Sequence, residues 1–162
     1  MKVRRMTDGD FDSIVQLGRS LRISEDGKKG WFTKGAVEKH IPFDIRLQNG
    51  FVAEEKGNIV GFLTYTSYGY FPAIGWIAVE PGSHRKGVGA SLVNKVEAEI
   101  RKLGGKELFV ETPTREAGIG TEYEKTYKFY EGVGFRLHRV KRKGEPDNGC
   151  NCDMAVMRKV LR

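Results

Sequence analysis

Residues 76–103, WIAVEPGSHRKGVGASLVNKVEAEIRKL, decide the fold. The apolar run at 76–79 ends at Pro81 and Gly82, as a buried strand ends in a turn. From Leu92 to Leu103 the apolar residues recur at helical spacing, and the glycines at 104–105 end that pattern. The sequence therefore predicts a strand, a loop and a helix that follow one another without a break.

The loop between this strand and this helix, residues 84–90, has the composition of an anion-binding site. Gly87 and Gly89 remove side chains that would keep a large ligand away from the backbone, and bare amides at a helix start attract anions. Arg85 and Lys86 add positive charge and hydrogen-bond donors. We expect a phosphate or pyrophosphate on the first turn of the helix. The alternative is a tight loop whose glycines only let the helix pack against the strand.

The spacing of this loop fits neither of the two common nucleotide-binding motifs. A dinucleotide-binding loop needs a further glycine, and a P-loop needs its lysine after the last glycine, whereas Lys86 precedes Gly87. A different phosphate-bearing ligand is therefore indicated.

The composition is that of one soluble globular domain. The chain has 162 residues, of which 39% are hydrophobic and 30% are charged, and a chain of this length buries a sufficient core without disulfides. No apolar run is long enough to span a bilayer, and the polar residues after Met6 leave no room for a signal peptide. We expect a single domain over residues 1–162, located in the cytoplasm and without a membrane partner.

Cysteine and histidine are too few and too dispersed to predict a metal site. Cys150 and Cys152 would close only a very short ring, and His40, His84 and His138 are far apart in the sequence. We expect two structural thiols and no metal.

Basic residues outnumber acidic ones by 28 to 21, which gives a net charge of +7. Such a balance favours a polyanionic partner, either a nucleic acid or a small molecule with several phosphates. The densest basic run, residues 139–143, is either a nucleic-acid contact or a solvated strand end. Because the chain lacks the basic and aromatic interleaving of RNA-binding modules, a nucleic acid is the less favoured partner.

The chain is expected to form both strands and helices. A helix is expected to begin with Thr7 as its N-cap and Asp10 at the third position, and further helices run near 37–45, 92–103 and 122–132. The expected strands are 2–6, 51–56, 59–65, 73–79, 107–111, 135–139 and 152–160.

The order of these elements predicts the sheet. The strand at 107–111 must return parallel to 76–79 through a right-handed helical crossover, whereas the earlier strands pair as antiparallel hairpins. The fold class is therefore α/β (α+β), a mixed and mostly antiparallel twisted sheet of about seven strands with a central parallel pair and helices on both faces. A ligand cleft is expected at the carboxyl ends of the parallel pair.

Two motifs carry a resemblance to a known family. VEPGSHRKGVGASL, followed downstream by YKFYEGVGF, resembles the GNAT-type acetyl-CoA-dependent N-acetyltransferases, and the resemblance covers nearly the whole chain. In that family R/Q-x-x-G-x-G/A binds the coenzyme A pyrophosphate, and F-Y-x-x-x-G-F carries a tyrosine close to the coenzyme sulfur. The first motif corresponds to residues 84–89 and the second to 129–135. His84 stands where the family has Arg or Gln, so Arg85 is expected to supply the charge.

The resemblance implies a GNAT-like fold, a single N-acetyltransferase domain and acetyl-CoA as co-substrate. Backbone amides of the strand at 76–79 would polarise the thioester carbonyl where the two parallel strands splay. The residues expected to bind the coenzyme are Ile77, Ala78, Val79, His84, Arg85, Lys86, Gly87, Val88, Gly89, Ala90, Tyr123, Thr126 and Phe129.

Acyl transfer from a thioester needs a proton for the leaving thiolate and a base for the amine. The resemblance places Tyr130 next to the sulfur, where its phenol can protonate the thiolate. The strand at 73–79 contains no acid, so Glu111 is the expected base, directly or through a water; the alternative is an exposed strand-end carboxylate. Tyr123 and Tyr127 are expected to line the pocket or the core.

The expected function is transfer of the acetyl group of acetyl-CoA to a primary amine of a small molecule, amino acid or peptide/protein in a direct ternary complex. The acceptor would enter between residues 22–35 and 65–71. The alternatives are a basic nucleic-acid-binding module or a non-catalytic acetyl-CoA sensor on the same fold. The acceptor's identity and a homodimer are left open.

Overall fold

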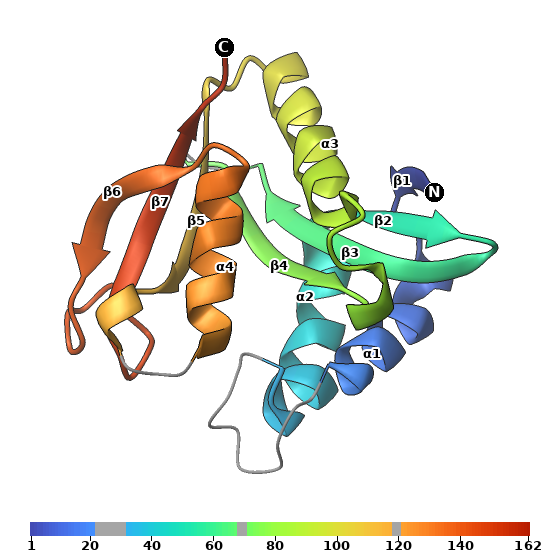
Figure 1. The fold of residues 1–162 in the computed structure, drawn as a ribbon, viewed down its shortest axis with the longest axis horizontal. Helices are drawn as coiled ribbons and strands as arrows, with labels where there is room; N and C mark the ends of the chain where they lie inside the picture. The colour runs from blue at the N-terminus through green and yellow to red at the C-terminus, as the bar shows by residue number, and fades with distance from the viewer. Residues whose placement is uncertain (22–31, 68–70, 118–120) are drawn as a thin grey trace.

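The computed structural model describes residues 1–21, 32–67, 71–117 and 121–162 (Figure 1). Within them the chain forms one seven-stranded sheet with the order β1-β2-β3-β4-β5-β7-β6. Only β4 and β5 pair in parallel, which confirms the predicted mixed sheet with one parallel pair. The strands are β1 (Lys2–Arg5), β2 (Asn49–Glu55), β3 (Asn58–Thr66), β4 (Ala73–Val79), β5 (Glu107–Pro113), β6 (Arg136–Lys141) and β7 (Met154–Val160).

Helices cover both faces of the sheet, as predicted. One face carries α1 (Phe11–Ser20) and α2 (Ile41–Leu47), and the other carries α3 (Val88–Lys102) and α4 (Thr121–Gly132) (Figure 1). Short 3-10 turns lie at Asp8–Asp10, Pro81–Ser83 and Arg115–Ala117. No described helix has both the length and the apolar character that crossing a membrane requires.

Two hydrophobic cores follow from this layering. The core beneath α3 and α4 includes Leu63, Leu92, Val110 and Phe135. The core beneath α1 and α2 includes Ile14, Val37, Ile41 and Phe62. Side chains alternate between the two faces of a strand, so neighbouring residues such as Phe62 and Leu63 enter different cores.

The helical segment before β2 is irregular because of a proline. Ala36–His40 forms a π-helix that leads directly into α2. Pro42 has no N–H, so the ordinary bond to the carbonyl four residues earlier is lost and the preceding turn widens. The sequence predicted a less regular helix here, but not this turn.

The parallel pair is short, and this leaves an opening in the sheet. β4 and β5 pair only at Ala73–Phe109 and Ile74–Val110. Immediately afterwards the pairing of β3 with β4 shifts register, and the Thr64 hydroxyl accepts a 2.8 Å hydrogen bond from the Trp76 amide. The two strands then separate, as predicted for residues 76–79.

The last two strands differ from the prediction at their ends. The strand predicted at 135–139 is β6, Arg136–Lys141, because the Phe135 amide instead bonds to the Tyr130 carbonyl and closes α4. The strand predicted from residue 152 starts at Met154, because Asp153 uses its carboxylate to accept the Lys143 amide at 2.8 Å.

Candidate functional site

A cleft with a volume of about 1220 Å³ opens where β4 and β5 separate. Its walls come from β4, the loop after β4, the start of α3, one side of α4 and the end of α2. Every residue predicted for the coenzyme or for catalysis lines this cleft except Lys86, which is exposed next to Arg85 and Gly87. The fold thus brings the two sequence motifs to one place.

The start of α3 presents bare amides to the cleft. Gly87 is the N-cap and has φ 77°, a left-handed conformation that glycine adopts without strain. The bond from the Ser91 amide to the Gly87 carbonyl spans 2.9 Å. The amides of Val88, Gly89 and Ala90 lie in the first turn, where a helix offers them no carbonyl partner. This is the geometry of an anion-binding helix start.

Gly89 packs against α4, whereas the sequence analysis considered only packing of this helix against the preceding strand, as an alternative. A Cβ atom at this position would lie 3.0 Å from the Phe129 ring of α4, whereas a Cβ at Gly87 would meet nothing within 4 Å. Gly89 therefore allows α4 to approach the start of α3, and Gly87 serves the conformation of the loop. The sequence analysis explained both glycines in the same way, by the access of a ligand to the backbone.

The His84 side chain turns back onto the strand that precedes it. Its Nε2 atom lies 2.8 Å from the Val79 carbonyl oxygen. Arg85 has φ 60° and is exposed, as is Lys86. The imidazole therefore fixes the loop to β4, while Arg85 lines the cleft and Lys86 is exposed next to it.

Two amides of β4 face the opening left by β5. The Trp76 amide bonds to Thr64 and the Glu80 amide to the Val60 carbonyl, both on the β3 side. Because alternate residues of a strand direct their N–H groups to opposite edges, the amides of Ile77 and Val79 face the gap. They are the hydrogen-bond donors available to a ligand laid along β4.

Tyr130 is buried at the wall of the cleft on the α3–α4 side. It is 4% exposed and lies between the rings of Phe129 and Phe135, with centroids 5.4 Å and 5.7 Å away. Burial raises the pKa of Tyr130 well above its ordinary value. Among the described residues no side chain hydrogen-bonds to its hydroxyl. The phenol therefore remains protonated at neutral pH.

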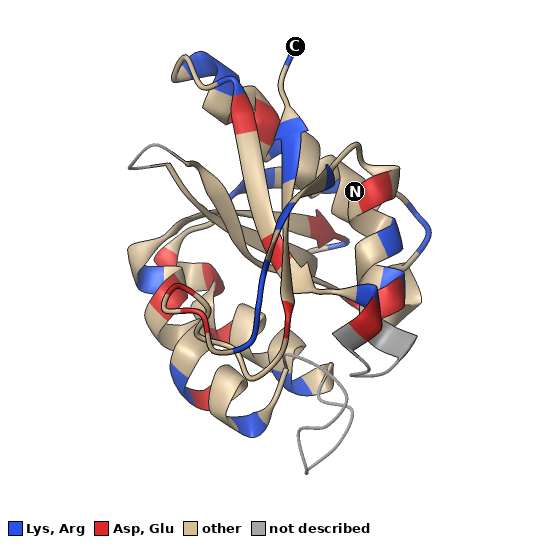
Figure 2. Ribbon diagram, turned by 90° about the vertical axis from the view of Figure 1, so that its left-hand side faces the viewer, with Lys and Arg blue, Asp and Glu red and all other residues tan. Residues whose placement is uncertain are grey.

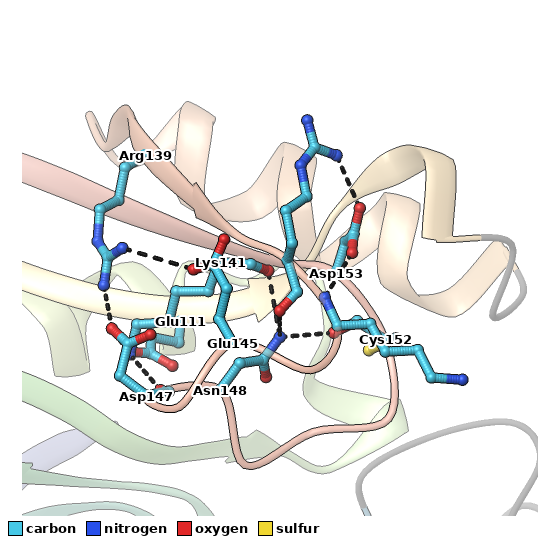
Figure 3. Close-up of polar contacts among 10 residues, drawn as sticks. Glu111, Arg139, Lys141, Glu145, Asp147, Asn148, Cys152 and Asp153 are labelled. Atoms are coloured by element: carbon cyan, nitrogen blue, oxygen red, sulfur yellow. Dashed lines mark hydrogen bonds and ion pairs between the residues drawn. The ribbon is translucent and has the colours of Figure 1, made fainter.

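Glu111 lies on the opposite face of the sheet. Val110 belongs to the core beneath α3 and α4, so the next residue of β5 points to the α1–α2 face. The Glu111 side chain is 45% exposed, and its Oε1 atom lies 2.5 Å from the Lys141 ammonium (Figure 3). The candidate acid and base thus stand on opposite sides of the separated strands.

The α1–α2 side of the cleft holds polar residues that the sequence analysis missed. The Trp76 indole donates a 2.7 Å hydrogen bond to Asp44 Oδ2. Gln48, one turn after Asp44, lies so close to Gly75 that an added Cβ would meet its Oε1 at 2.2 Å. Within the described residues this oxygen is buried without a hydrogen-bond partner. Asp44 and Gln48 are one helical turn apart in the sequence, but only the folded chain brings Asp44 to Trp76 and Gln48 to Gly75.

The predicted acceptor entrance falls largely outside the described residues, which exclude 22–31 and 68–70. At its edges the structure gives two results. Phe32 lines the cleft, with its ring centroid 5.9 Å from that of Trp76. Tyr65, predicted at the entrance, is instead a core residue that is 1% exposed and stacks on Phe51.

The other two tyrosines of α4 have different positions. Tyr123 lines the cleft, and burial raises its pKa to about 12. Tyr127 is a core residue, and the Arg115 guanidinium lies 4.6 Å from its ring centroid. The sequence analysis expected each of these tyrosines to line either the pocket or the core, and the structure has one in each place.

The basic run at 139–143 is largely neutralised by ion pairs. Arg139 pairs with Glu145 and Asp147, Lys141 with Glu111, and Arg142 with Asp153. In Figure 2 basic and acidic segments are interspersed over the face that includes β6. The charges of Arg139, Lys141 and Arg142 are therefore compensated by acidic side chains of the same face.

The two cysteines are free thiols. Cys150 and Cys152 are unbonded thiols, and burial raises the pKa of both. Across residues 1–21, 32–67, 71–117 and 121–162, no three His, Cys, Asp or Glu side chains are grouped to hold a metal ion.

Comparison with known proteins gives a consistent result. The model of the GNAT acetyltransferase domain matches residues 47–137. S-(2-succino)cysteine N-acetyltransferase of Bacillus subtilis (strain 168) is 29% identical over an alignment of 174 residues that includes 99% of this chain and 96% of that protein. A GNAT-family protein from Desulfovibrio desulfuricans superposes with a TM-score of 0.76 at 20% identity over 99% of both chains. An aminoglycoside 6'-N-acetyltransferase in complex with coenzyme A superposes with a TM-score of 0.70 at 18% identity, covering 100% of this chain and 98% of that one.

Proposed function

Because the chain belongs to the GNAT acetyltransferase family, we propose that it moves the acetyl group of acetyl-CoA directly to a primary amine of a small molecule, amino acid or peptide. The observation that carries this proposal is the division of one cleft by the separated strands. Tyr130 lies on one face of the sheet and Glu111 on the other. Each reactant can therefore approach the gap from its own side.

The coenzyme would occupy the α3–α4 side of the cleft. Its pyrophosphate would accept hydrogen bonds from the first amides of α3, with Arg85 and Lys86 adding charge at the surface. Its pantetheine arm would run along β4 to the gap, past the amides of Val79 and Ile77. Thr126, Phe129 and Tyr123 would form the α4 wall, which they line in the structure. The neighbour solved with coenzyme A supports acetyl-CoA as co-substrate.

The chemical steps follow from these positions. The amine nitrogen attacks the thioester carbon while Glu111, directly or through a water, takes a proton from the amine. The carbonyl oxygen gains negative charge, which the amides of β4 facing the gap stabilise. The carbon–sulfur bond then breaks, and Tyr130 donates its proton to the thiolate. The products are the acetamide and free coenzyme A.

The acceptor would occupy the α1–α2 side, where Asp44, Gln48 and Glu111 offer hydrogen-bond acceptors to an amine. The curated relative acts on S-(2-succino)cysteine and aligns over 99% of this chain. Amino acids, and S-substituted cysteines in particular, are therefore the first acceptors to examine.

The test is a screen of amines with acetyl-CoA in which release of the coenzyme A thiol is measured. The library contains amino acids, S-substituted cysteines including S-(2-succino)cysteine, aminoglycosides and peptides with free N-termini. We expect thiol release with at least one amine, and a product heavier by one acetyl group in mass spectrometry. Binding of acetyl-CoA without thiol release from any amine would instead indicate a sensor.

A further inference from the structure

The carboxylate of Glu111 is held in one orientation by a residue two strands away. In the sheet, β7 separates β5 from β6. Lys141, the last residue of β6, nevertheless reaches over β7 and places its ammonium 2.5 Å from Glu111 Oε1 (Figure 3). A glutamate side chain that is 45% exposed would otherwise sample several rotamers.

Lys141 is itself held in place by contacts with Asp147. Its side chain is only 13% exposed, and its ammonium donates a 3.1 Å hydrogen bond to the Asp147 carbonyl and lies 3.7 Å from the carboxylate of the same residue. Arg139 binds that carboxylate, and this hydrogen bond lowers the pKa of Asp147. Asp147 therefore stays ionised and gives the lysine a second acidic partner besides Glu111.

The loop that carries Asp147 is braced by hydrogen bonds rather than by a core. The Asn148 side-chain amide donates to the carbonyls of Lys141, Arg142 and Cys152 at 3.1, 3.0 and 2.9 Å (Figure 3). The carbonyl oxygen of the Asn148 side chain accepts the Cys150 amide at 2.9 Å. One side chain thus ties both ends of the loop between β6 and β7 together.

We infer that Lys141, backed by Asp147, is a positioning residue that orients the Glu111 carboxylate toward the acceptor amine. This inference rests on the proposed function, in which Glu111 is the base. Lys141 does not line the cleft, so it acts through Glu111 and not on a substrate. Catalytic groups displaced by about 1 Å lose up to about a hundredfold in rate, which gives such a brace a kinetic consequence.

The test compares Lys141→Met with Lys141→Arg and with a matched control. Arg142→Met removes a neighbouring cation of the same loop, but the Arg142 side chain is 69% exposed and pairs with Asp153 instead of Glu111. The assay is thiol release with S-(2-succino)cysteine, or with the fastest amine of the screen. We expect Lys141→Met to lower kcat about tenfold with an unchanged KM for acetyl-CoA, Lys141→Arg to restore most of the rate, and Arg142→Met to match the wild type.

A double-mutant cycle separates positioning from a structural role. If Lys141 acts through Glu111, then adding Lys141→Met to Glu111→Gln changes kcat no further, because the group being oriented is already lost. Equal losses of kcat in both backgrounds, or equal losses in Lys141→Met and Arg142→Met, would overturn the inference. If Glu111→Gln keeps full turnover, the base assignment itself fails and the inference fails with it. If Glu111→Gln is impaired and Lys141→Met is not, only the inference fails.

Discussion

The Trp76 indole donates a 2.7 Å hydrogen bond to Asp44, and this contact joins the α1–α2 side of the cleft to β4. Trp76 lies on β4 next to Ile77, whose amide faces the gap. Asp44 lies on α2, one turn before Gln48. The hydrogen bond therefore fixes an acidic side chain relative to the amides that would polarise the acetyl group.

Asp44→Asn tests whether this carboxylate attracts the acceptor. The asparagine keeps an oxygen for the Trp76 indole but removes the negative charge. We expect the KM for the amine to rise about three- to tenfold, while the KM for acetyl-CoA stays the same. Steady-state kinetics with each substrate varied in turn measures both. An unchanged KM for the amine would remove Asp44 from the acceptor site.

Tyr130→Phe tests the proton donor. We expect kcat to fall about a hundredfold with little change in acetyl-CoA affinity, because the ring stays and only the hydroxyl is lost. Tyr127→Phe is the matched control, since Tyr127 lies on the same helix but does not line the cleft. If the two variants have equal turnover, Tyr130 is a packing residue.

The pH dependence of turnover gives a separate test of Tyr130. Burial raises its pKa, so the phenol keeps its proton at pH values where an ordinary tyrosine, with a pKa of about 10, would lose it. We expect no loss of kcat attributable to this residue between about pH 7 and about pH 10. A fall in kcat near pH 9 that disappears in Tyr130→Phe would show that burial does not raise the pKa of Tyr130.

Thr112→Val is predicted to stabilise the ligand-free protein against unfolding. Thr112 is 1% exposed, and among the described residues its hydroxyl oxygen has no hydrogen-bond partner. Valine has the same shape and removes the uncompensated burial, so the free energy of unfolding should rise by about 1 kcal/mol. Denaturant unfolding measures the change. A loss of stability would show that the hydroxyl has a partner.

Asp10 is predicted to contribute to the acid limit of stability. Hydrogen bonds from Arg4, at 2.8 Å to each carboxylate oxygen, and from the Thr7 amide lower the pKa of Asp10 in the folded state. A carboxyl with a lowered folded pKa stabilises the fold above its unfolded pKa of about 3.9, and this contribution is lost as the pH falls through the folded value. Asp10→Asn should cost about 2 kcal/mol at neutral pH and flatten the decline in stability below about pH 4. Urea unfolding at several pH values measures both, and an unchanged pH profile would contradict the prediction.

The sequence predicted those parts of the fold that depend on neighbouring residues. The strand, loop and helix of 76–103 were predicted because turn residues and helical periodicity act locally. The parallel return of β5 follows from the handedness of the crossover. The order of β7 and β6 at the far side of the sheet carried no such local signal.

The parts of the site that the sequence missed depend on contacts between distant segments. Asp44 and Trp76 are 32 positions apart, and Glu111 and Lys141 are 30. Neither pair belongs to one helix or hairpin, so no spacing rule connects them. The role of Gly89 was assigned incompletely for the same reason, because Phe129 reaches it from another helix.

The most direct test of the account is an amide proton–nitrogen correlation spectrum recorded while coenzyme A is added. If the pyrophosphate binds at the start of α3, the amide signals of Gly87, Val88 and Gly89 shift strongly as they donate to phosphate oxygens, whereas the signal of Gly9, in the 3-10 turn before α1, does not shift. Saturable binding that leaves the signals of Gly87, Val88 and Gly89 in place would contradict the account, because the coenzyme would then bind elsewhere.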